Sequence, residues 1–420
     1  MNDFNQELHF RLAALREQGL YRQLRRVDSP QGTRIRIDGE PLLNFSSNDY
    51  LGLANDPRLK EAARKAVEEY GAGASRLICG SLGPHHELEE ALAAFKGAEA
   101  ALCFSSGYVT ALSTIGALVG KSDLIIIDKR VHASVVDSAR LSGARLRVFA
   151  HNDMAELEEV LQWADHQGGK AVAPSSTEQA PALSQSRERR PRVLIVTESV
   201  FSMDGDLAPL REIVDLKDRY GAWLMLDEAH ATGLYGQQRR GLAEAFELAD
   251  RIEIQMGTLG KALGAAGGYI CGSRLLIDFL VNRARGFIFS TAPVPAAAAA
   301  ATAAVRLVQS AEGKARRTLL WQRVDEVKNV LVGAGWKLPP VKSAIIPLIV
   351  GAEGKAIEMS AALRARGIFI PPVRYPAVAR GEARLRLTVS ATHTSADIAS
   401  LARALKLCCP PTAEPRSPNC

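Results

Sequence analysis

Two short polar stretches of the sequence carry residue types that could do chemistry. Residues 226–230 read LDEAH, which places Asp227 three positions before His230, and residues 257–262 read GTLGKA, which places Lys261 directly after Gly260. DEAH is a signature of nucleotide-hydrolysing helicases. The same residues also suit a different chemistry, in which a lysine amine condenses with an aldehyde and a carboxylate stabilises a cationic ring.

The nucleotide-hydrolase interpretation requires a phosphate-binding loop of the form GxxxxGK[ST] before the DEAH strand. The nearest match surrounds Lys261, and it fails in three ways. Gln255 stands where the first glycine belongs, and Ala262 stands where a magnesium-binding hydroxyl belongs. The loop also follows DEAH instead of preceding it, so the sequence disfavours a nucleotide hydrolase.

The lysine–aldehyde chemistry fits the positions of Asp227 and Lys261. Each residue comes just after an expected strand of one parallel sheet, and ligands of such sheets bind at the carboxyl ends of the strands. The lysine could form a Schiff base with the aldehyde of pyridoxal phosphate. Asp227 could then keep the ring nitrogen protonated, because a neighbouring negative charge favours the cationic form.

Further residues could bind the rest of such a cofactor. Residues 105–108 read SSGY and precede the apolar helical pattern of 109–118, so the free N–H groups of a helix start could bind the phosphate. Thr258 could add a hydroxyl, and His132 could lie over the ring face. Each residue alone has an ordinary structural explanation. Their joint occurrence along one βα pattern favours the pyridoxal phosphate interpretation.

The elements that must position these residues can be predicted from the apolar pattern. We expect a helix from Asp56-Pro57 to about Gly71, because an N-cap residue precedes a proline there. Short apolar runs that alternate with helices indicate a mostly parallel sheet covered on both faces. The expected strands are 124–128, 145–150, 193–197, 222–226 and 251–256, and further helices are expected at 209–220, 292–307 and 317–331.

The pattern predicts an α/β protein with a large domain, built on this sheet, and a smaller α/β C-terminal domain. We expect an N-terminal helix and arm over residues 1–45, the large domain over 46–290, the small domain over 291–407 and a disordered tail over 408–420. The polar stretch 168–191 interrupts the pattern and predicts a surface loop or insertion.

Composition excludes several classes of protein. Of the 420 residues, 47% are apolar and 23% are charged, and no run of about 18 apolar residues predicts a membrane span. No signal peptide is visible, so we expect a cytoplasmic location. The net charge of +6 includes no basic stripe interleaved with aromatic residues, which argues against nucleic acid as a partner. The six cysteines lack CxxC spacing, and we expect no metal site.

Beyond these local patterns, residues 43–407 resemble the α-oxoamine synthases, which are pyridoxal-phosphate transferases of fold type I. The resemblance is carried by NFSSNDYLGLA (44–54), SRLICGS (75–81), SSGY (105–108), HAS (132–134), HND (151–153), TESVFSMDGDLAPL (197–210), LDEAH (226–230), GTLGKALG (257–264), FSTAP (289–293) and ARLRLTVSATH (383–393).

The resemblance implies a role for each matching residue. Lys261, Asp227 and His132 match the Schiff-base lysine, the ring-nitrogen partner and the ring-stacking histidine, and these three are the expected catalytic residues. Among the remaining expected cofactor contacts, His230 and Ser202 lie at the phenolic oxygen, and Gly107, Tyr108 and Thr258 at the phosphate. The hydroxyl of Thr291 is expected to contact the phosphate bound in the neighbouring subunit of a homodimer. Arg386 matches a residue that binds the amino-acid carboxylate, and Asn48 matches one that lines the site.

Residues 371–394 are most similar to the biotin-pathway branch of this family. That branch implies decarboxylative condensation of an amino acid, L-alanine, with pimeloyl-CoA or a pimeloyl carrier protein. Residues 80–86 read GSLGPHH in place of the more common GYSxxH, and together with the long 168–191 insertion they leave the acyl substrate open. Glycine C-acetyltransferase and serine palmitoyltransferase remain alternatives.

Some residues have no settled role at this stage. Arg22, Arg25 and Arg26 are candidates for binding the far carboxylate of a dicarboxylic acyl chain, and a solvated basic turn is the alternative. His85 is assigned no role. For His86 we expect an ordinary surface or capping position.

Overall fold

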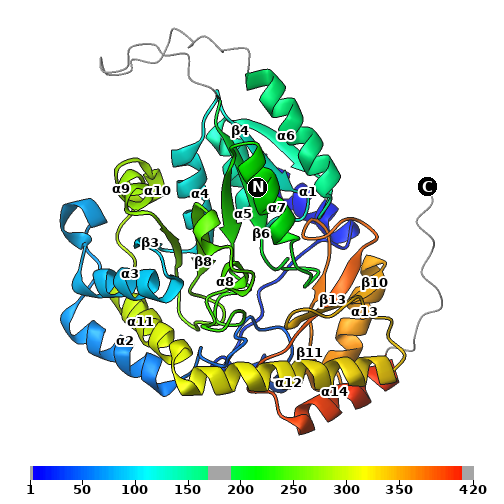
Figure 1. Ribbon diagram of the computed structural model, residues 1–420. Coiled ribbons are helices and arrows are strands. Elements are labelled where there is room, and N and C mark those ends of the chain that lie inside the picture. The colour runs from blue at the N-terminus through cyan, green and yellow to red at the C-terminus, as the bar shows by residue number, and fades with distance from the viewer. Residues whose placement is uncertain (1–2, 169–190, 409–420) are drawn as a thin grey trace, which may run out of the picture. The chain divides into compact units, whose positions relative to one another are not determined.

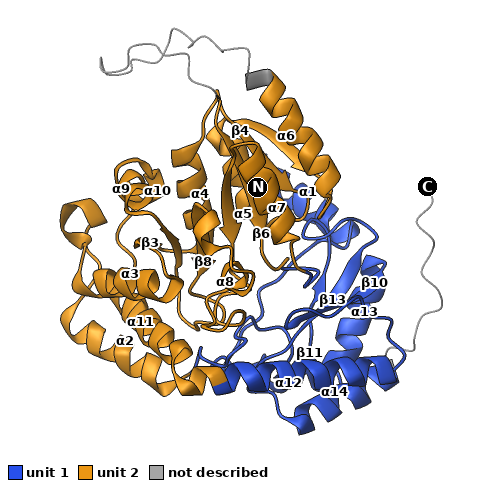
Figure 2. Ribbon diagram, viewed as in Figure 1, with its two compact units in different colours: residues 1–55, 202–206, 315–420 blue, residues 56–201, 207–314 orange. Residues whose placement is uncertain are grey.

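The computed structural model describes residues 3–168 and 191–408, and the chain divides into two compact units (Figure 2). Unit 1 comprises Met1–Asn55, Ser202–Asp206 and Ala315–Cys420, and unit 2 comprises Asp56–Phe201 and Leu207–Lys314. The expected insertion and the expected disordered tail fall almost entirely at 169–190 and 409–420, outside the described residues.

Unit 2 is built on a seven-stranded sheet whose strand order is β3-β9-β8-β7-β6-β4-β5. Only β9 runs antiparallel to its neighbours, and the strands from β8 to β5 are parallel. In that order the strands are β3 (Ala100–Phe104), β9 (Gly268–Gly272), β8 (Ile254–Thr258), β7 (Trp223–Asp227), β6 (Val193–Glu198), β4 (Leu124–Asp128) and β5 (Arg145–Phe149). The predicted mostly parallel sheet is confirmed.

Helices lie on both sides of this sheet, with α4 and α5 packed together and α6 against α7 (Figure 1). They bury the apolar faces of the parallel strands, as the unbroken apolar runs of β4 and β6 require. The helices of unit 2 are α2 (Pro57–Glu69), α3 (Gly83–Lys96), α4 (Gly107–Leu118), α5 (Ala133–Ser142), α6 (Met154–Gly168), α7 (Leu210–Arg219), α8 (Leu242–Ala245), α9 (Arg274–Arg283), α10 (Arg285–Ile288) and α11 (Pro295–Gln309).

Local sequence explains where several of these elements begin and end. Asp56 caps α2 by accepting a hydrogen bond from the backbone N–H of Arg58, as the Asp-Pro pair predicts. The helix ends at Glu69, just before Gly71. Strand β8 starts at Ile254, later than predicted, because Ala249–Arg251 forms a 3₁₀ turn. The strand then ends at Thr258.

Unit 1 combines the N-terminal arm with the C-terminal part of the chain. One sheet has the order β1-β2-β11 and the other has the order β10-β13-β12. The strands are β1 (Arg34–Ile37), β2 (Glu40–Asn44), β10 (Ile345–Gly351), β11 (Ile368–Phe369), β12 (Pro372–Val373) and β13 (Ala383–Thr388), and the helices are α1 (Asp3–Glu17), α12 (Ala311–Gly333), α13 (Glu353–Arg364) and α14 (Ser395–Cys408). Every residue of β13 is buried.

The two units differ in their boundaries from the predicted domains. Unit 2 continues beyond residue 290 to Lys314, because α11 packs against α2 and α3. The arm before residue 46 belongs with the C-terminal segment, because Leu43 and Asn44 of β2 pair with β11. Among the described residues, no helix is long and apolar enough to cross a membrane.

Candidate active site

The carboxyl ends of the parallel strands in unit 2 bring several predicted residues to one edge of the sheet. Asp227 ends β7 and Thr258 ends the neighbouring β8, with Asp227 in register with Met256. Lys261 follows three residues after Thr258. This is the edge at which parallel sheets bind their ligands.

Lys261 and His230 are in direct contact at this edge. The Nζ atom of Lys261 lies 2.8 Å from Nε2 of His230, within hydrogen-bond distance. The His230 side chain is buried, whereas Lys261 is only half-buried. The amine is therefore held in place by a protein group and still borders accessible space.

Asp227 is a buried carboxylate that lies within electrostatic range of the same lysine. Its Oδ1 accepts a hydrogen bond from the backbone N–H of Ala229 at 2.9 Å. Burial raises the pKa of Asp227, while the charge of Lys261, this backbone hydrogen bond and His132 act in the opposite direction. Nearby positive charge thus favours the ionised form of a carboxyl group that burial alone would neutralise.

His132 lies at the N-terminus of α5. Its Nδ1 accepts from the backbone N–H of Ser134 at 3.2 Å and lies 2.8 Å from the Ser134 hydroxyl. Although the residue is exposed, desolvation by the surrounding protein lowers the pKa of its imidazole, while Asp227 acts to raise it. A fixed, neutral ring with an accessible face is suited to stacking on a planar group.

The start of α4, where the sequence predicts an anion-binding position, lies in unit 2. Ser106 caps the helix by accepting from the N–H of Val109, and the first N–H groups of a helix have no partner within it. A Cβ atom built on Gly107 would lie 3.6 Å from Cβ of Thr258, so this helix start adjoins the end of β8. The Tyr108 ring is exposed and its hydroxyl donates to Asp137.

Glycine is required at position 268 by the close packing beneath this helix start. A Cβ atom there would lie 2.8 Å from the Cα of Gly107 and 2.4 Å from Oγ1 of Thr110. The Thr258 hydroxyl donates to the carbonyl of Gly267 at 3.0 Å and accepts from Gly260 at 3.3 Å. The hydroxyl is therefore held at this edge of the sheet.

Thr291 lies on an exposed turn that His85 holds in place. The backbone of Thr291 bridges to Ser75, and the Nε2 atom of His85 lies 2.7 Å from the carbonyl of Pro293. Because Nδ1 of His85 accepts from the N–H of Leu82, Nε2 carries the proton and donates to Pro293. His85 is thus the capping histidine of α3, and His86 has the predicted surface position.

Unit 1 carries Arg386, which contacts both Asn48 and Ser202. Arg386 is 9% exposed; its Nε donates to the carbonyl of Ser202 and its Nη1 to Oδ1 of Asn48 at 3.1 Å. Nη1 also donates to Thr388 at 3.2 Å. The alternation of RLRLT places residues 386 and 388 on one face of a strand but does not specify this hydrogen bond. No carboxylate of the described residues pairs with this guanidinium, whose five N–H donors exceed the partners it has.

The three N-terminal arginines have different surroundings within unit 1. Arg26 pairs with the carboxylate of Asp28, and Arg25 lies over the ring of Phe369. Arg22 donates to the carbonyl of Tyr375 at 3.4 Å. Burial and the charge of Arg22 both lower the pKa of Arg374, which places two guanidinium groups near each other.

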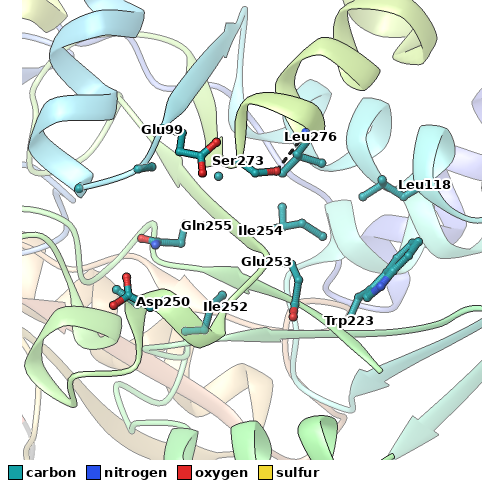
Figure 3. Close-up of a pocket in the computed structure, with 14 residues that line it drawn as sticks. Glu99, Leu118, Trp223, Asp250, Ile252, Glu253, Ile254, Gln255, Ser273 and Leu276 are labelled. Carbon is teal, nitrogen blue, oxygen red and sulfur yellow. Dashed lines mark hydrogen bonds between the residues drawn. The ribbon is translucent and has the colours of Figure 1, made fainter. Parts of the chain in front are cut away.

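A cavity of about 480 Å³ lies at the opposite edge of the unit 2 sheet, where β7 and β8 begin (Figure 3). Trp223 and Ile254 line it, together with Glu253. The Glu253 carboxylate is already engaged by Lys217 and by the backbone N–H of Leu224. This cavity contains none of the predicted site residues. No group of three or more metal-ligating side chains occurs in the described parts of the chain.

The chain is similar to known proteins over nearly its whole length. A family model described as aminotransferase class I and II matches residues 40–405. The 8-amino-7-oxononanoate synthase of Geobacter sulfurreducens is 46% identical over 389 residues, covering 92% of this chain and 94% of that protein. The enzyme of the same name from Anaeromyxobacter sp. is 45% identical and covers 96% of each chain.

Solved structures show the same similarity. A serine palmitoyltransferase variant from S. paucimobilis, with a bound PLP–myriocin aldimine, superposes with a TM-score of 0.84 at 28% identity and 96% coverage of each chain. The 8-amino-7-oxononanoate synthase of Francisella tularensis gives a TM-score of 0.69 at 25% identity, covering 87% of this chain and 97% of that one. The predicted resemblance to the α-oxoamine synthases and the predicted fold type are confirmed.

Proposed function

Since this chain belongs to the aminotransferase class I and II family, we propose that it is a pyridoxal-phosphate-dependent α-oxoamine synthase that forms 8-amino-7-oxononanoate in biotin biosynthesis. The substrates are L-alanine and a pimeloyl thioester. The observation that carries the proposal is the contact of Lys261 with His230 beside the buried carboxylate of Asp227. The names of the relatives that match over nearly the whole chain agree with it.

The residues at this edge of unit 2 fit pyridoxal phosphate. Lys261 supplies an amine for the aldehyde, Asp227 a carboxylate for the ring nitrogen, and the start of α4 a set of N–H groups for the phosphate. His132 supplies a ring for stacking. When bound, the cofactor acts as an electron sink for the negative charge that forms at the amino-acid Cα.

Lys261 has two tasks in this proposal, attachment of the cofactor and proton transfer at the substrate Cα. An amine that removes this proton must be neutral and held within hydrogen-bond reach of it. The contact with His230 restricts where Nζ can go. His230 and Ser202 are the proposed partners of the cofactor's phenolic oxygen. Asp227 keeps the proton on the ring nitrogen.

Arg386 is proposed to bind the carboxylate of the amino acid. The guanidinium is buried and has donors to spare, and it lacks a carboxylate partner among the described residues. A carboxylate ligand would supply the missing counter-charge through paired hydrogen bonds. Asn48 holds the guanidinium from the side by accepting from Nη1.

Arg22 is proposed to bind the far carboxylate of the pimeloyl chain. It lies near a second cation, Arg374, so an anion bound there would relieve repulsion between two positive charges. Arg26 already has Asp28 as a partner and is the weaker candidate. An acetyl or palmitoyl chain has no second carboxylate and would make no use of this pair.

We further propose a homodimer in which Thr291 reaches the phosphate of the neighbouring subunit. Exposed apolar side chains surround the turn that carries it, and a surface of this kind is typical of a subunit contact. These side chains are Leu77, Ile78, Phe289 and Val294, which are 48%, 80%, 71% and 59% exposed. Sedimentation equilibrium would give the mass of a dimer, and a monomer at micromolar concentration would contradict the assembly. The cytoplasmic location stays a prediction.

Product identification tests the proposed function. The purified protein, loaded with pyridoxal phosphate, is incubated with alanine, glycine or serine and with pimeloyl, acetyl or palmitoyl thioesters of CoA. We expect mass spectrometry to find 8-amino-7-oxononanoate as the main product. A pimeloyl carrier protein is tested in parallel as the donor. Preferred turnover of serine with palmitoyl-CoA, or of glycine with acetyl-CoA, would replace the proposed substrates.

A further inference from the structure

A fully buried ion pair lies directly beside the candidate site in unit 2. The side chains of Lys96, at the end of α3, and Glu228, directly after β7, are both 0% exposed. Lys96 donates to Oε2 of Glu228 and to the backbone carbonyl of Arg240. The other carboxylate oxygen accepts from the N–H of Ala243 at 3.0 Å. Sequence patterns gave neither residue a role.

The backbone around Glu228 is shaped to accommodate its carboxylate. Gly241 has a φ of 137°, and a Cβ atom there would lie 2.3 Å from Oε2 of Glu228. Replacing a buried ion pair by apolar residues is often neutral or stabilising, so stability alone does not explain the pair. The cost of burying two charges points to a role in the neighbouring site.

The turn that Glu228 begins also carries His230. The backbone N–H of Glu228 donates to the carbonyl of Met256 at 2.8 Å, which ties the turn to β8. Its carbonyl accepts from Ala231 and Thr232, both at 2.9 Å. The pair with Lys96 therefore fixes a turn with Asp227 immediately before it and His230 within it.

The charge of Glu228 also acts on Asp227. Burial raises the pKa of Asp227, and the negative charge of Glu228 acts in the same direction. The other groups that face Asp227 are Lys261 and His132, which act in the opposite direction, and the buried phenol of Tyr269. A cation paired with Glu228 offsets its unfavourable effect on the neighbouring carboxylate.

We propose that Glu228 and Lys96 are positioning residues whose ion pair fixes the 227–230 turn and cancels the buried negative charge beside Asp227, so that Asp227 remains ionised at neutral pH. This inference rests on the proposed function, because it concerns the carboxylate that holds the proton of the bound cofactor. Neither residue touches the cofactor or a substrate in this proposal.

Two substitutions that should move the pH profile of activity in opposite directions test this inference. Lys96→Met leaves the charge of Glu228 unbalanced, and Asp227 should then lose its proton only at higher pH. Glu228→Gln removes a negative charge beside Asp227, and the proton should leave at lower pH. We expect the acid limb of kcat/KM, and the matching change in the absorption spectrum of the bound cofactor, to move by about one pH unit upward in the first variant and downward in the second.

A variant with both substitutions completes a double-mutant cycle. Lys96→Met with Glu228→Gln removes both charges, so the acid limb should return to within a few tenths of a pH unit of the unmodified protein. Limbs that move in the same direction in both single variants, or that do not move, would overturn the inference. If Lys96→Met does not fold, Glu228→Gln and the double variant still decide the question, since the downward shift must appear in the first and vanish in the second.

Lys217 and Glu253 provide a matched control at the other end of β7. Lys217 is buried and pairs with Glu253, whose carboxylate also accepts from the N–H of Leu224. Lys217→Met should lower the urea midpoint of the cofactor-free protein without moving the acid limb. A shift in this control equal to that of Lys96→Met would show that loss of any buried lysine paired near β7 suffices, and would overturn the specific role.

The same spectra separate this inference from the proposed function. If the unmodified protein gives no absorption band with pyridoxal phosphate and no product, the proposed function fails. If the unmodified protein gives both and the two limbs move together, only the role of the ion pair fails.

Discussion

Two buried arginines on strand β13 of unit 1 differ in whether the described residues supply a carboxylate partner. The guanidinium of Arg384 pairs with Asp204 at 2.6 Å and with Glu382 at 3.1 Å. Arg386, two residues along on the same face of the strand, bonds only to neutral oxygen atoms. The first has its counter-charge within the protein, and the second has donors left for a ligand.

The same contrast distinguishes the two ends of β7 in unit 2. At the beginning of the strand, Glu253 is matched by Lys217 and a backbone N–H. At its end, Asp227 has one backbone partner and two nearby groups that favour its charge. The Glu253 carboxylate thus has a lysine partner away from the candidate site, whereas Asp227, inside it, lies near groups that favour its charge without an ion-pair partner in hydrogen-bond contact among the described residues.

Lys261 should show the largest effect among the residues of the candidate site. Lys261→Ala should lower product formation by about a thousandfold or more, because it removes both cofactor attachment and the proposed base. It should also abolish the absorption band of the bound cofactor. Lys217→Ala, which removes a fully paired lysine, should lower thermal stability and leave the band intact. An unchanged absorption band in Lys261→Ala would contradict the proposal that Lys261, and not another lysine, attaches the cofactor.

The two arginines of β13 should separate binding from stability. Arg386→Leu should raise KM for alanine about a hundredfold through loss of paired, charge-assisted hydrogen bonds, with little loss of stability. Arg384→Leu should remove the ion pair with Asp204 and cost about 3 kcal/mol of unfolding free energy. Steady-state kinetics and urea unfolding of both variants check the pair. Equal losses of stability in both variants would contradict the contrast between a ligand-binding Arg386 and a fold-stabilising Arg384.

His393 should behave as a fully paired group. Its Nδ1 accepts from Ser390 and its Nε2 lies 3.0 Å from the carbonyl of Asn44, and burial lowers the pKa of the imidazole to about 4. The unfolded chain therefore takes up a proton below about pH 6.5 while the folded protein does not. Stability from this residue is complete above pH 6.5 and is lost as the pH falls from there to about 4.

The expected loss from His393 is about 2 kcal/mol between pH 7 and pH 5. Urea unfolding at several pH values measures it. His393→Asn should start from lower stability and show a correspondingly weaker pH dependence over this range. Identical slopes for the two proteins would contradict the assignment.

Arg22 should show the smallest effect. Arg22→Ala should raise KM for pimeloyl-CoA about threefold, the cost of one screened charge contact, and leave kcat nearly unchanged. Arg26→Ala, at an arginine already paired with Asp28, is the matched control and should have no such effect. Equal losses in both variants would favour a general effect of surface charge over a carboxylate site.

Local sequence was enough to predict the five parallel strands of the unit 2 sheet and the strand-end position of Asp227, but not strand β3 at the sheet's edge. Apolar runs, caps and glycines are read from neighbouring residues, and Asp56-Pro57 marked the start of α2 correctly. Contacts between distant residues were not accessible in this way. Lys96 meets Glu228 across 132 positions, and His85 meets Pro293 across 208, because the packing of whole elements brings them together.

The family resemblance supplied residue roles that no local pattern contains. The RLR run does not tell which arginine has a carboxylate partner, since both lie on one face of β13. The structure distinguishes them through Glu382 and through Asp204, which comes from another part of the chain. The packing of α11 on α2 and α3 likewise depends on contacts between segments that are distant in the sequence.

Chemical trapping of the cofactor tests the central claim most directly. The protein is loaded with pyridoxal phosphate, reduced with borohydride, digested and analysed by peptide mass spectrometry. We predict that the pyridoxyl group is found on the peptide that contains Lys261. A stable adduct on a different lysine, or no adduct from a protein that forms product, would contradict the account.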